Sequence, residues 1–305
     1  MSKKTFPRSF AHPRYWPTWI AIGAMYVVAW LPWRLKLAIG RGIGLLAWAL
    51  IKRRRHITAT NIALCFPEKS PQAQRQLVKE TFMANGIGLV ETATGWCRSA
   101  EGIRHRVAYN GEEHLARAKA QGKGVLVVGI HFSTLDLGGA LHSLFFPADV
   151  VYRPHNNPLF ERFMTKARRG IFGAASDRHD LRGVVRRIKG GHAVWYSPDQ
   201  DFGREASVFA PFFGIDAASI RLTSKIARMT GAPVMPLMFH RNPDNRTYTL
   251  EYLPALENFP SGDEVADATQ VNAFIEMAIR KHPEQYLWLH RRFKTRPEGE
   301  ASFYD

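Results

Sequence analysis

The chain has 305 residues, of which 46% are hydrophobic and 22% charged. This composition excludes a disordered chain and a small disulfide-stapled protein, and charges recur too often for a polytopic transporter. Lys and Arg number 42 against 26 Asp and Glu, a net charge of +16, so we expect an anionic partner: nucleic acid, membrane, phosphorylated substrate or acidic protein. Cys65 and Cys97 form no metal-ligand spacing and are expected to be reduced thiols.

The N-terminal residues 1–55 predict a membrane anchor. Residues 15–33 carry no charge and as a helix would reach roughly 28 Å, close to the hydrocarbon thickness of a bilayer. Tryptophans at both ends fit an aromatic belt. The apolar segment 35–51 is interrupted by Lys36 and Arg41, which favours an amphipathic helix at the membrane interface. The basic residues before the span are Lys3, Lys4, Arg8 and Arg14. More basic residues follow the span, which favours a cytoplasmic catalytic domain; a buried core helix is the alternative.

Residues 56–305 predict a single α/β domain. Gly124–Ile130 is a continuous apolar run, typical of a strand buried on both faces. Further strands are expected at 149–153, 192–197, 234–240 and 247–253. Helices are expected at 72–97, 111–121, from 135, and at 158–169, 180–189, 218–231 and 265–282. This alternation predicts a mostly parallel or mixed sheet covered on both faces, with ligands bound beyond the carboxyl ends of its strands.

The motif HFSTLD at 131–136 follows the expected first strand directly. A neutral imidazole can take the proton of a hydroxyl group, and a carboxylate can hold the other ring nitrogen. His131 in the turn and Asp136 in the first helical turn would therefore suit acyl transfer to an alcohol. The alternative is structural, because Ser133 and Asp136 also fit a helix capping box.

Polar and aromatic residues follow the other strands and predict a substrate site. The expected substrate-binding side chains are Arg153, Asn156, Asn157, Arg168, Asp199 and Asp201. The alternatives are an Asn-Pro turn around residue 157, a solvated basic face at Arg168 and a tight turn at 199–201. The aromatic run 207–214 predicts an acyl-chain pocket; core packing is the alternative. The expected pocket residues are Phe209, Phe212 and Phe213.

Taken in chain order, these motifs resemble the late (secondary) acyltransferases of lipid A biosynthesis, the lauroyl/myristoyl transferase family of Gram-negative bacteria. Besides the apolar N-terminus, the matching segments are NIALCFP at 61–67, HFSTLD at 131–136, YRPHNNP at 152–158, WYSPDQDFG at 195–203, SVFAPFFG at 207–214 and EQYLWLHRRFKTRPEG at 284–299. The resemblance implies a glycerolipid-acyltransferase-like α/β domain on a single-pass inner-membrane anchor, with the active site facing the cytoplasm.

The resemblance also implies the reaction: a fatty acyl group passes from acyl carrier protein to a hydroxyl of a 3-hydroxyacyl chain on a lipid A precursor, often carrying Kdo. His131 would be the general base and Asp136 its partner, at a position where many members carry Glu. The family's arginine maps to Arg168. Because a thioester donor is already activated, no metal or other cofactor is expected beyond the acyl carrier protein co-substrate.

Two alternatives stay open at the level of sequence. Glycerophosphate-type acyltransferases also use HxxxxD, but their Pro-Glu-Gly-Thr motif has a likeness only in PEGE at 297–300. An acyl-enzyme on Ser133 is the mechanistic alternative to direct transfer. A nucleic acid partner is not expected, because the basic residues are dispersed. Acyl chain length, the acylated position and the oligomeric state cannot be read from the sequence.

Overall fold

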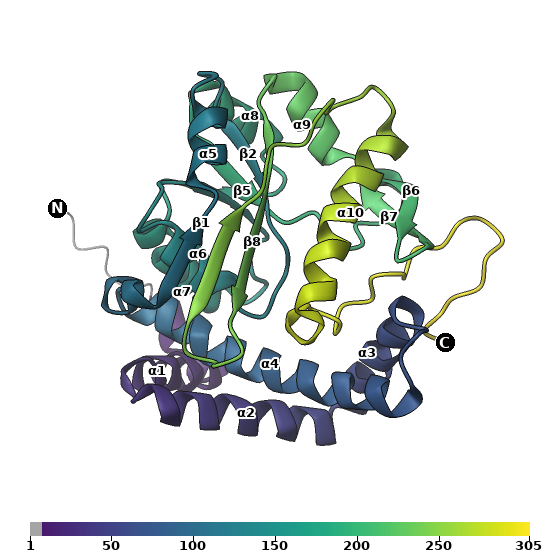
Figure 1. Cartoon of the computed structure of the whole chain (residues 1–305). Coiled ribbons are helices and arrows are strands. Elements are labelled where there is room, and N and C mark those ends of the chain that lie inside the picture. The colour runs from purple at the N-terminus through teal and green to yellow at the C-terminus, as the bar shows by residue number, and fades with distance from the viewer. Residues whose placement is uncertain (1–7) are drawn as a thin grey trace.

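The structure is a computed structural model that describes residues 8–305. In this part of the chain, seven strands form one sheet in the order β1-β9-β8-β2-β5-β3-β4 (Figure 1). The strands are β1 (Val107–Asn110), β2 (Val125–Val128), β3 (Asp149–Tyr152), β4 (Ala175–Asp177), β5 (Ala193–Tyr196), β8 (Val234–Arg241) and β9 (Tyr248–Tyr252). β8, β2, β5, β3 and β4 run parallel, and only the β8–β9 pairing is antiparallel. The predicted mostly parallel α/β sheet is confirmed.

Helices cover both faces of this sheet, and strand β2 is buried between them. Val125 and Val127 face the core built with α5 and α6, whereas Leu126 and Val128 face the core built with α8, α9 and α10. This alternation follows from the two-residue period of a strand and explains the uninterrupted apolar run. The helices of the domain are α5 (Glu112–Lys119), α6 (Leu135–His142), α7 (Pro158–Ile171), α8 (Leu181–Lys189), α9 (Leu222–Thr230) and α10 (Glu264–Lys281).

The N-terminal segment departs from the prediction. The chain forms α1 (Trp16–Trp30), α2 (Trp33–Leu50), α3 (Lys52–Cys65) and α4 (Pro71–Cys97). The expected span over 15–33 is wrong: the helix ends at Trp30, and Pro32 lies at the N-cap of the next helix, because proline cannot continue a helix. Across residues 8–305, no helix is both long and apolar enough to cross a membrane. Lys3 and Lys4 lie outside the described residues.

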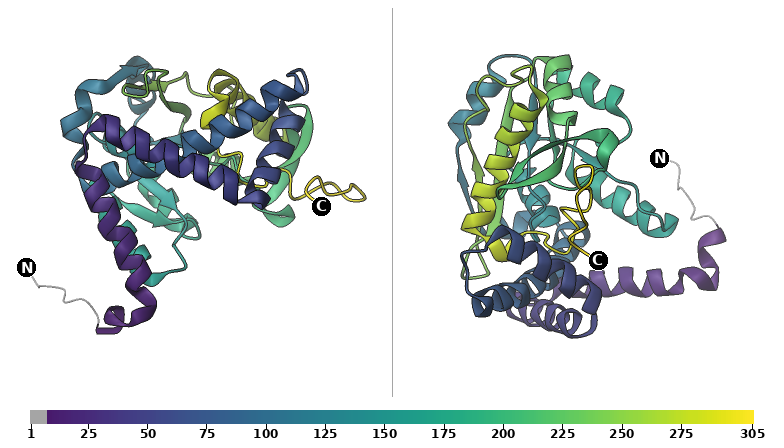
Figure 2. Two further views of the ribbon diagram at one scale, coloured as in Figure 1. Left: turned by 90° about the horizontal axis from the view of Figure 1, so that it is seen from below. Right: turned by 90° about the vertical axis from the view of Figure 1, so that its right-hand side faces the viewer.

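Helices α1 and α2 instead meet at an angle and both contact α4: α2 runs along it, whereas α1 projects away from the domain and also contacts α7 (Figure 2). Close contact between α2 and α4 depends on glycine: a Cβ atom at Gly86 would lie 2.1 Å from the Gly40 carbonyl oxygen, and one at Gly44 would lie 2.3 Å from the Phe82 carbonyl oxygen. Lys36, expected on a polar interfacial face, is only 2% exposed and donates hydrogen bonds to Ala29 and Thr94.

A hairpin of β6 (Ser207–Phe212) and β7 (Ile215–Ile220) was not predicted. The helix expected over 218–231 begins only at Leu222, because residues 218–220 pair with β6. Both turn residues, Phe213 and Gly214, have positive φ, as a two-residue hairpin turn often requires. Strands β1 and β4 were also missed. Short 3₁₀ helices are η1 (Arg8–Ala11), η2 (Pro13–Tyr15), η3 (Ala100–Arg106), η4 (Arg204–Ala206) and η5 (Pro283–Gln285).

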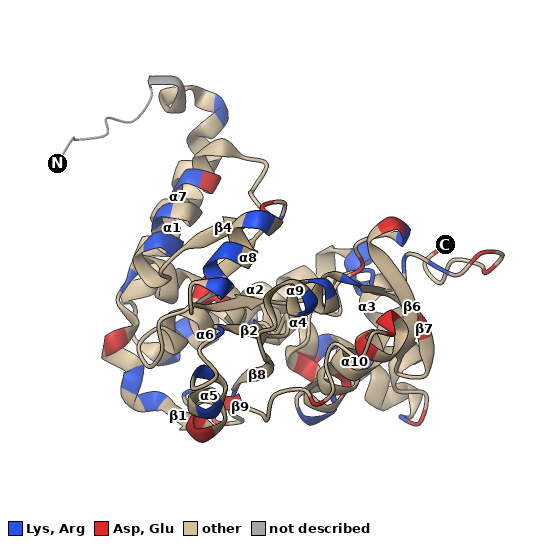
Figure 3. Ribbon diagram, turned by 90° about the horizontal axis from the view of Figure 1, so that it is seen from above, with Lys and Arg blue, Asp and Glu red and all other residues tan. Residues whose placement is uncertain are grey.

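Lys and Arg residues are frequent on α7 and α8, where much of the ribbon is blue (Figure 3). Arg187 is neutralised locally, because it makes two hydrogen bonds of 2.6 and 2.9 Å to the buried carboxylate of Asp149. Several others are exposed to solvent: Lys166, Arg169, Arg182, Arg186 and Lys189. Part of the net positive charge therefore lies on the two helices that precede and follow β4 in the chain.

Candidate active site

His131 and Asp199 meet at the carboxyl ends of two neighbouring strands. Val128 of β2 is in register with Tyr196 of β5, and each polar residue comes three positions after its strand residue. His131 Nδ1 lies 2.6 Å from Asp199 Oδ1, and the His131 backbone N–H donates to Asp199 Oδ2 at 3.0 Å. The Asp199 side chain is fully buried, whereas the His131 side chain is 24% exposed. This buried carboxylate therefore holds a partly open imidazole at two points.

Asp136 lies in the first turn of α6, as predicted, but it does not hold the imidazole nitrogen of His131. Its Oδ1 accepts a hydrogen bond from Arg168 Nη2 at 3.3 Å. The predicted His131–Asp136 pair is thus corrected: Asp199 occupies Nδ1, because adjacent parallel strands bring residues 131 and 199 side by side. The capping box is also absent, since the N-cap is Thr134 without a side-chain hydrogen bond.

Arg168 is held in a fixed position between two aromatic rings. Its guanidinium carbon lies 5.5 Å from the centre of the Trp96 ring and 5.1 Å from that of Tyr152. Cations over aromatic faces are attracted by the ring quadrupole. The sequence signalled Arg168, but nothing in it pointed to Trp96. Asp136 and Arg168 form a second charged pair, 28% and 16% exposed, beside the His131–Asp199 pair.

The protonation of the His131–Asp199 pair follows from burial and charge. Burial lowers the pKa of His131, but the charge and hydrogen bond of Asp199, with a contribution from Asp136, raise it above its ordinary value. Burial alone would raise the pKa of Asp199, yet its contacts with His131 lower it overall. Asp199 therefore stays ionised, and His131 becomes a neutral base only above its raised pKa.

The C-terminal segment clasps both halves of this pair. The Ser133 N–H donates to the Gln285 carbonyl at 2.7 Å, and the Leu287 N–H donates to the His131 carbonyl at 3.0 Å. The Tyr286 hydroxyl donates to the backbone carbonyl of Asp199 at 3.0 Å. The sequence marked this C-terminal run only as one of the matching segments, at 284–299, so its role in holding the site was not predicted.

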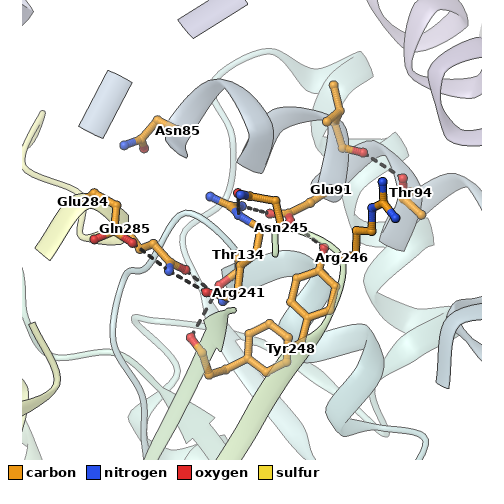
Figure 4. A network of polar contacts seen from close by, with 12 residues as sticks. Asn85, Glu91, Thr94, Thr134, Arg241, Asn245, Arg246, Tyr248, Glu284 and Gln285 are labelled. Carbon is orange, nitrogen blue, oxygen red and sulfur yellow. Dashed lines mark hydrogen bonds and ion pairs between the residues drawn. The ribbon is translucent and has the colours of Figure 1, made fainter. Parts of the chain in front are cut away.

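A buried polar network supports this clasp from behind (Figure 4). The side-chain amide of Gln285 accepts from the Arg241 N–H at 2.9 Å and donates to the Arg241 carbonyl at 2.8 Å. Arg241 in turn donates to Glu91 of α4 at 2.8 Å, and the Tyr248 hydroxyl donates to the same carboxylate at 2.6 Å. Because Glu91 and Arg241 are at most 3% exposed, breaking this network would leave a buried charge unpaired.

The other predicted binding residues fall into two groups. Arg153 and Asn156 are exposed. Asn157 has a structural role, because its side chain accepts from the Leu159 and Phe160 N–H groups at the start of α7. Asp201 is also engaged internally, since it accepts from the backbone and hydroxyl of Thr295 at 2.7 and 2.9 Å. For Asn157 and Asp201, the turn-forming alternative describes their contacts.

The predicted aromatic pocket is replaced by core packing. Phe212 is fully buried and Phe213 is 9% exposed, and both belong to the core that includes Phe66 and Trp288. Phe209 is half-buried under Arg204. A cavity of about 410 Å³ lies elsewhere, between α1, α4, α6 and α7, where Trp96 is part of its wall. Within residues 8–305, no group of three or more His, Cys, Asp or Glu side chains is placed to hold a metal.

Comparison with known proteins assigns this arrangement to a family. The sequence profile of the bacterial lipid A biosynthesis acyltransferases matches residues 3–295. The chain belongs to this family. It is 42% identical to the lipid A biosynthesis lauroyltransferase and 41% identical to the palmitoleoyltransferase of Escherichia coli (strain K12), over 98% of each chain. It is 28% identical to the myristoyltransferase of the same organism, over 98% of this chain and 93% of that one. The family resemblance inferred from the motifs is confirmed, and the chain is an acyltransferase.

Proposed function

We propose that this acyltransferase moves a fatty acyl group from an acyl carrier protein thioester to a hydroxyl group of a hydroxyacyl chain on a lipid A precursor that carries Kdo. Its relatives are named for transferring lauroyl, palmitoleoyl and myristoyl groups in lipid A biosynthesis. One observation carries the chemistry: a partly exposed imidazole, His131, whose Nδ1 is held by a buried carboxylate. Such a ring presents Nε2 as a base.

In the proposed reaction, His131 Nε2 takes the proton of the acceptor hydroxyl as its oxygen attacks the thioester carbonyl. The carbon–sulfur bond then breaks, and the proton on Nε2 passes to the departing thiolate, so that the imidazole returns to its neutral form. The pair of Asp136 and Arg168 lies beside this centre. We assign Arg168 to a negatively charged group of the substrate or to the developing oxyanion.

The charge of the protein suits these partners. The lipid A precursor carries phosphates and acyl carrier protein is acidic, so both are drawn to a chain of net charge +16. The exposed basic residues of α7 and α8 (Figure 3) supply a surface for the acidic donor.

We also propose that the enzyme rests on the cytoplasmic face of the inner membrane through α1 and α2. Both helices expose large apolar side chains on the side away from α4: Trp16, Ile20, Val27, Trp30, Leu35, Leu46 and Leu50 are between 45% and 72% exposed. The exposed cations Arg34, Arg41, Lys52, Arg53 and Arg54 accompany them. Apolar faces rimmed by basic residues are typical of helices that lie in the interface of an anionic bilayer.

The test of the reaction is mass spectrometry of the lipid product. The detergent-solubilised protein would receive acyl carrier protein loaded with chains of ten to sixteen carbons and Kdo-modified tetra-acylated precursor. We expect a single acyl mass gain, which His131→Ala abolishes. Acylation of glycerol 3-phosphate or lysophosphatidic acid in place of the lipid A precursor would contradict the proposal and favour a glycerolipid enzyme.

A further inference from the structure

We propose that Asp199 is the positioning residue of His131, and that the acid of the HxxxxD motif, Asp136, serves the Arg168 side of the site instead. This inference rests on the proposed function, since it concerns how the base is set for that reaction. Its first support is the two-point attachment: one buried carboxylate bonds both the ring Nδ1 and the backbone N–H of His131. That contact fixes the ring relative to its own main chain.

The contact also decides the tautomer of the ring. An ionised carboxylate can only accept hydrogen bonds, so the proton of neutral His131 must lie on Nδ1, which is 2.6 Å from Asp199 Oδ1. The lone pair is then on Nε2, the atom that the reaction needs. The His131 side chain is partly open to solvent, whereas Asp199 is enclosed, and Nε2 is the ring nitrogen that Asp199 does not contact.

Asp136 is not free to do the same work. Its carboxylate is engaged by Arg168 at 3.3 Å, and Arg168 is clamped by Trp96 and Tyr152. Rotating Asp136 onto the imidazole would strip Arg168 of its counter-ion and would still have to displace Asp199. The two carboxylates therefore have separate partners, although both charges favour protonated His131.

The loop that carries Asp199 is held independently of His131. The Tyr286 hydroxyl binds the Asp199 carbonyl, and Asp201, two residues later, is anchored on Thr295. The carboxylate is thus held in place before the imidazole binds it, as positioning requires. Asp201 is also a matched control: it is a buried carboxylate on the same loop, and its hydrogen bonds are to Thr295 and Gly203 rather than to His131.

The first experiment compares kcat/KM against pH for the full-length wild type, Asp199→Asn and Asp201→Asn. The charged or titratable groups facing His131 are Asp199, Asp136 and His290. We expect the acid limb of the wild-type profile to move to lower pH in Asp199→Asn, because the ring loses its anionic partner, and the plateau to fall by about 10²- to 10⁴-fold. In Asp201→Asn the limb should stay in place, whatever the loss of stability.

An unmoved acid limb in Asp199→Asn would overturn the inference, even with a lowered plateau, because a structural role alone would give that result. If the wild type transfers no acyl group, but NMR finds the proton of the neutral His131 ring on Nδ1, then the proposed function is wrong and this inference stands.

A second measurement needs no change at Asp199. In wild type labelled with ¹⁵N-histidine, the His131 signals are those that disappear in His131→Gln. Above the pKa of the ring, we expect the proton on Nδ1 and an unprotonated Nε2. A ring with the proton on Nε2 would overturn the assignment regardless of activity.

Discussion

Replacing Gly86 by Ala tests the packing of α2 on α4. A Cβ atom there would lie 2.1 Å from the Gly40 carbonyl oxygen and 2.5 Å from the Gly44 nitrogen, whereas real Cβ contacts stay beyond 3.0 Å. The helices must therefore separate by about 0.9 Å, and backbone atoms cannot rotate away. Overpacking costs typically about 1–3 kcal/mol, and alanine returns about 1 kcal/mol of helix propensity. From the upper end of that range we expect a net loss of about 2 kcal/mol.

The assay is thermal unfolding followed by circular dichroism in detergent, where this loss corresponds to a Tm lower by about 4 °C. Gly42→Ala is the matched control on α2, because a Cβ atom there meets nothing within 4 Å. Its propensity gain should leave Tm unchanged or slightly raised. A Gly86→Ala protein that unfolds at or above the wild-type temperature would refute the backbone-to-backbone packing of these helices.

Three further predictions each test one residue. Gly88→Ala places a Cβ atom 2.3 Å from the Ser133 carbonyl oxygen and so displaces the turn that carries His131. We expect the rate of acyl transfer to fall by at least about tenfold, and an unchanged rate would contradict this. Burial, with nearby arginines, lowers the pKa of Lys36 to about 8. Between that pH and about 10.4 the unfolded chain binds more protons than the folded one, so the free energy of unfolding rises with pH. In Lys36→Met, urea unfolding should show no such rise. In flotation with anionic phospholipid vesicles, Ile20→Glu should no longer bind the vesicles. Met229→Glu, at an exposed apolar site on α9, is the control and should float like wild type. If both variants float equally, α1 is not the element that binds the membrane.

The domain was largely predictable because its signals are local. A helix at 158–169 and the strand at 124–130 appear as α7 and β2, since capping residues and continuous apolar runs act over a few positions. The hairpin at 207–220 was not predicted because its second strand, 215–220, contains Ala-Ala-Ser near its end, and this sequence also suits a helix. Pairing with β6 decided the outcome, and pairing is a tertiary interaction.

The N-terminus shows the limit of hydropathy. Residues 15–33 are long and apolar enough for a membrane span. A hydropathy count, however, takes no account of the helix break near Pro32, or of the glycines in α2 and α4 that let these two helices pack closely. It also misplaces Lys36, which is buried and donates to Ala29 and Thr94. Side-chain position within a helix bundle depends on the partner helix, which is encoded some fifty residues further along the chain.

The same reasoning explains why His131 was found but its partner was not. Spacing along the chain favoured Asp136, five positions away, whereas the sheet favours Asp199, 68 positions away, because adjacent parallel strands align residues at equal distances from their ends. Strand order is a property of the whole sheet and is not written in any one motif. The two carboxylates have different partners, so their substitutions should have different effects. Neutralising Asp199 should change the pKa and tautomer of the His131 imidazole, whereas neutralising Asp136 should first release Arg168.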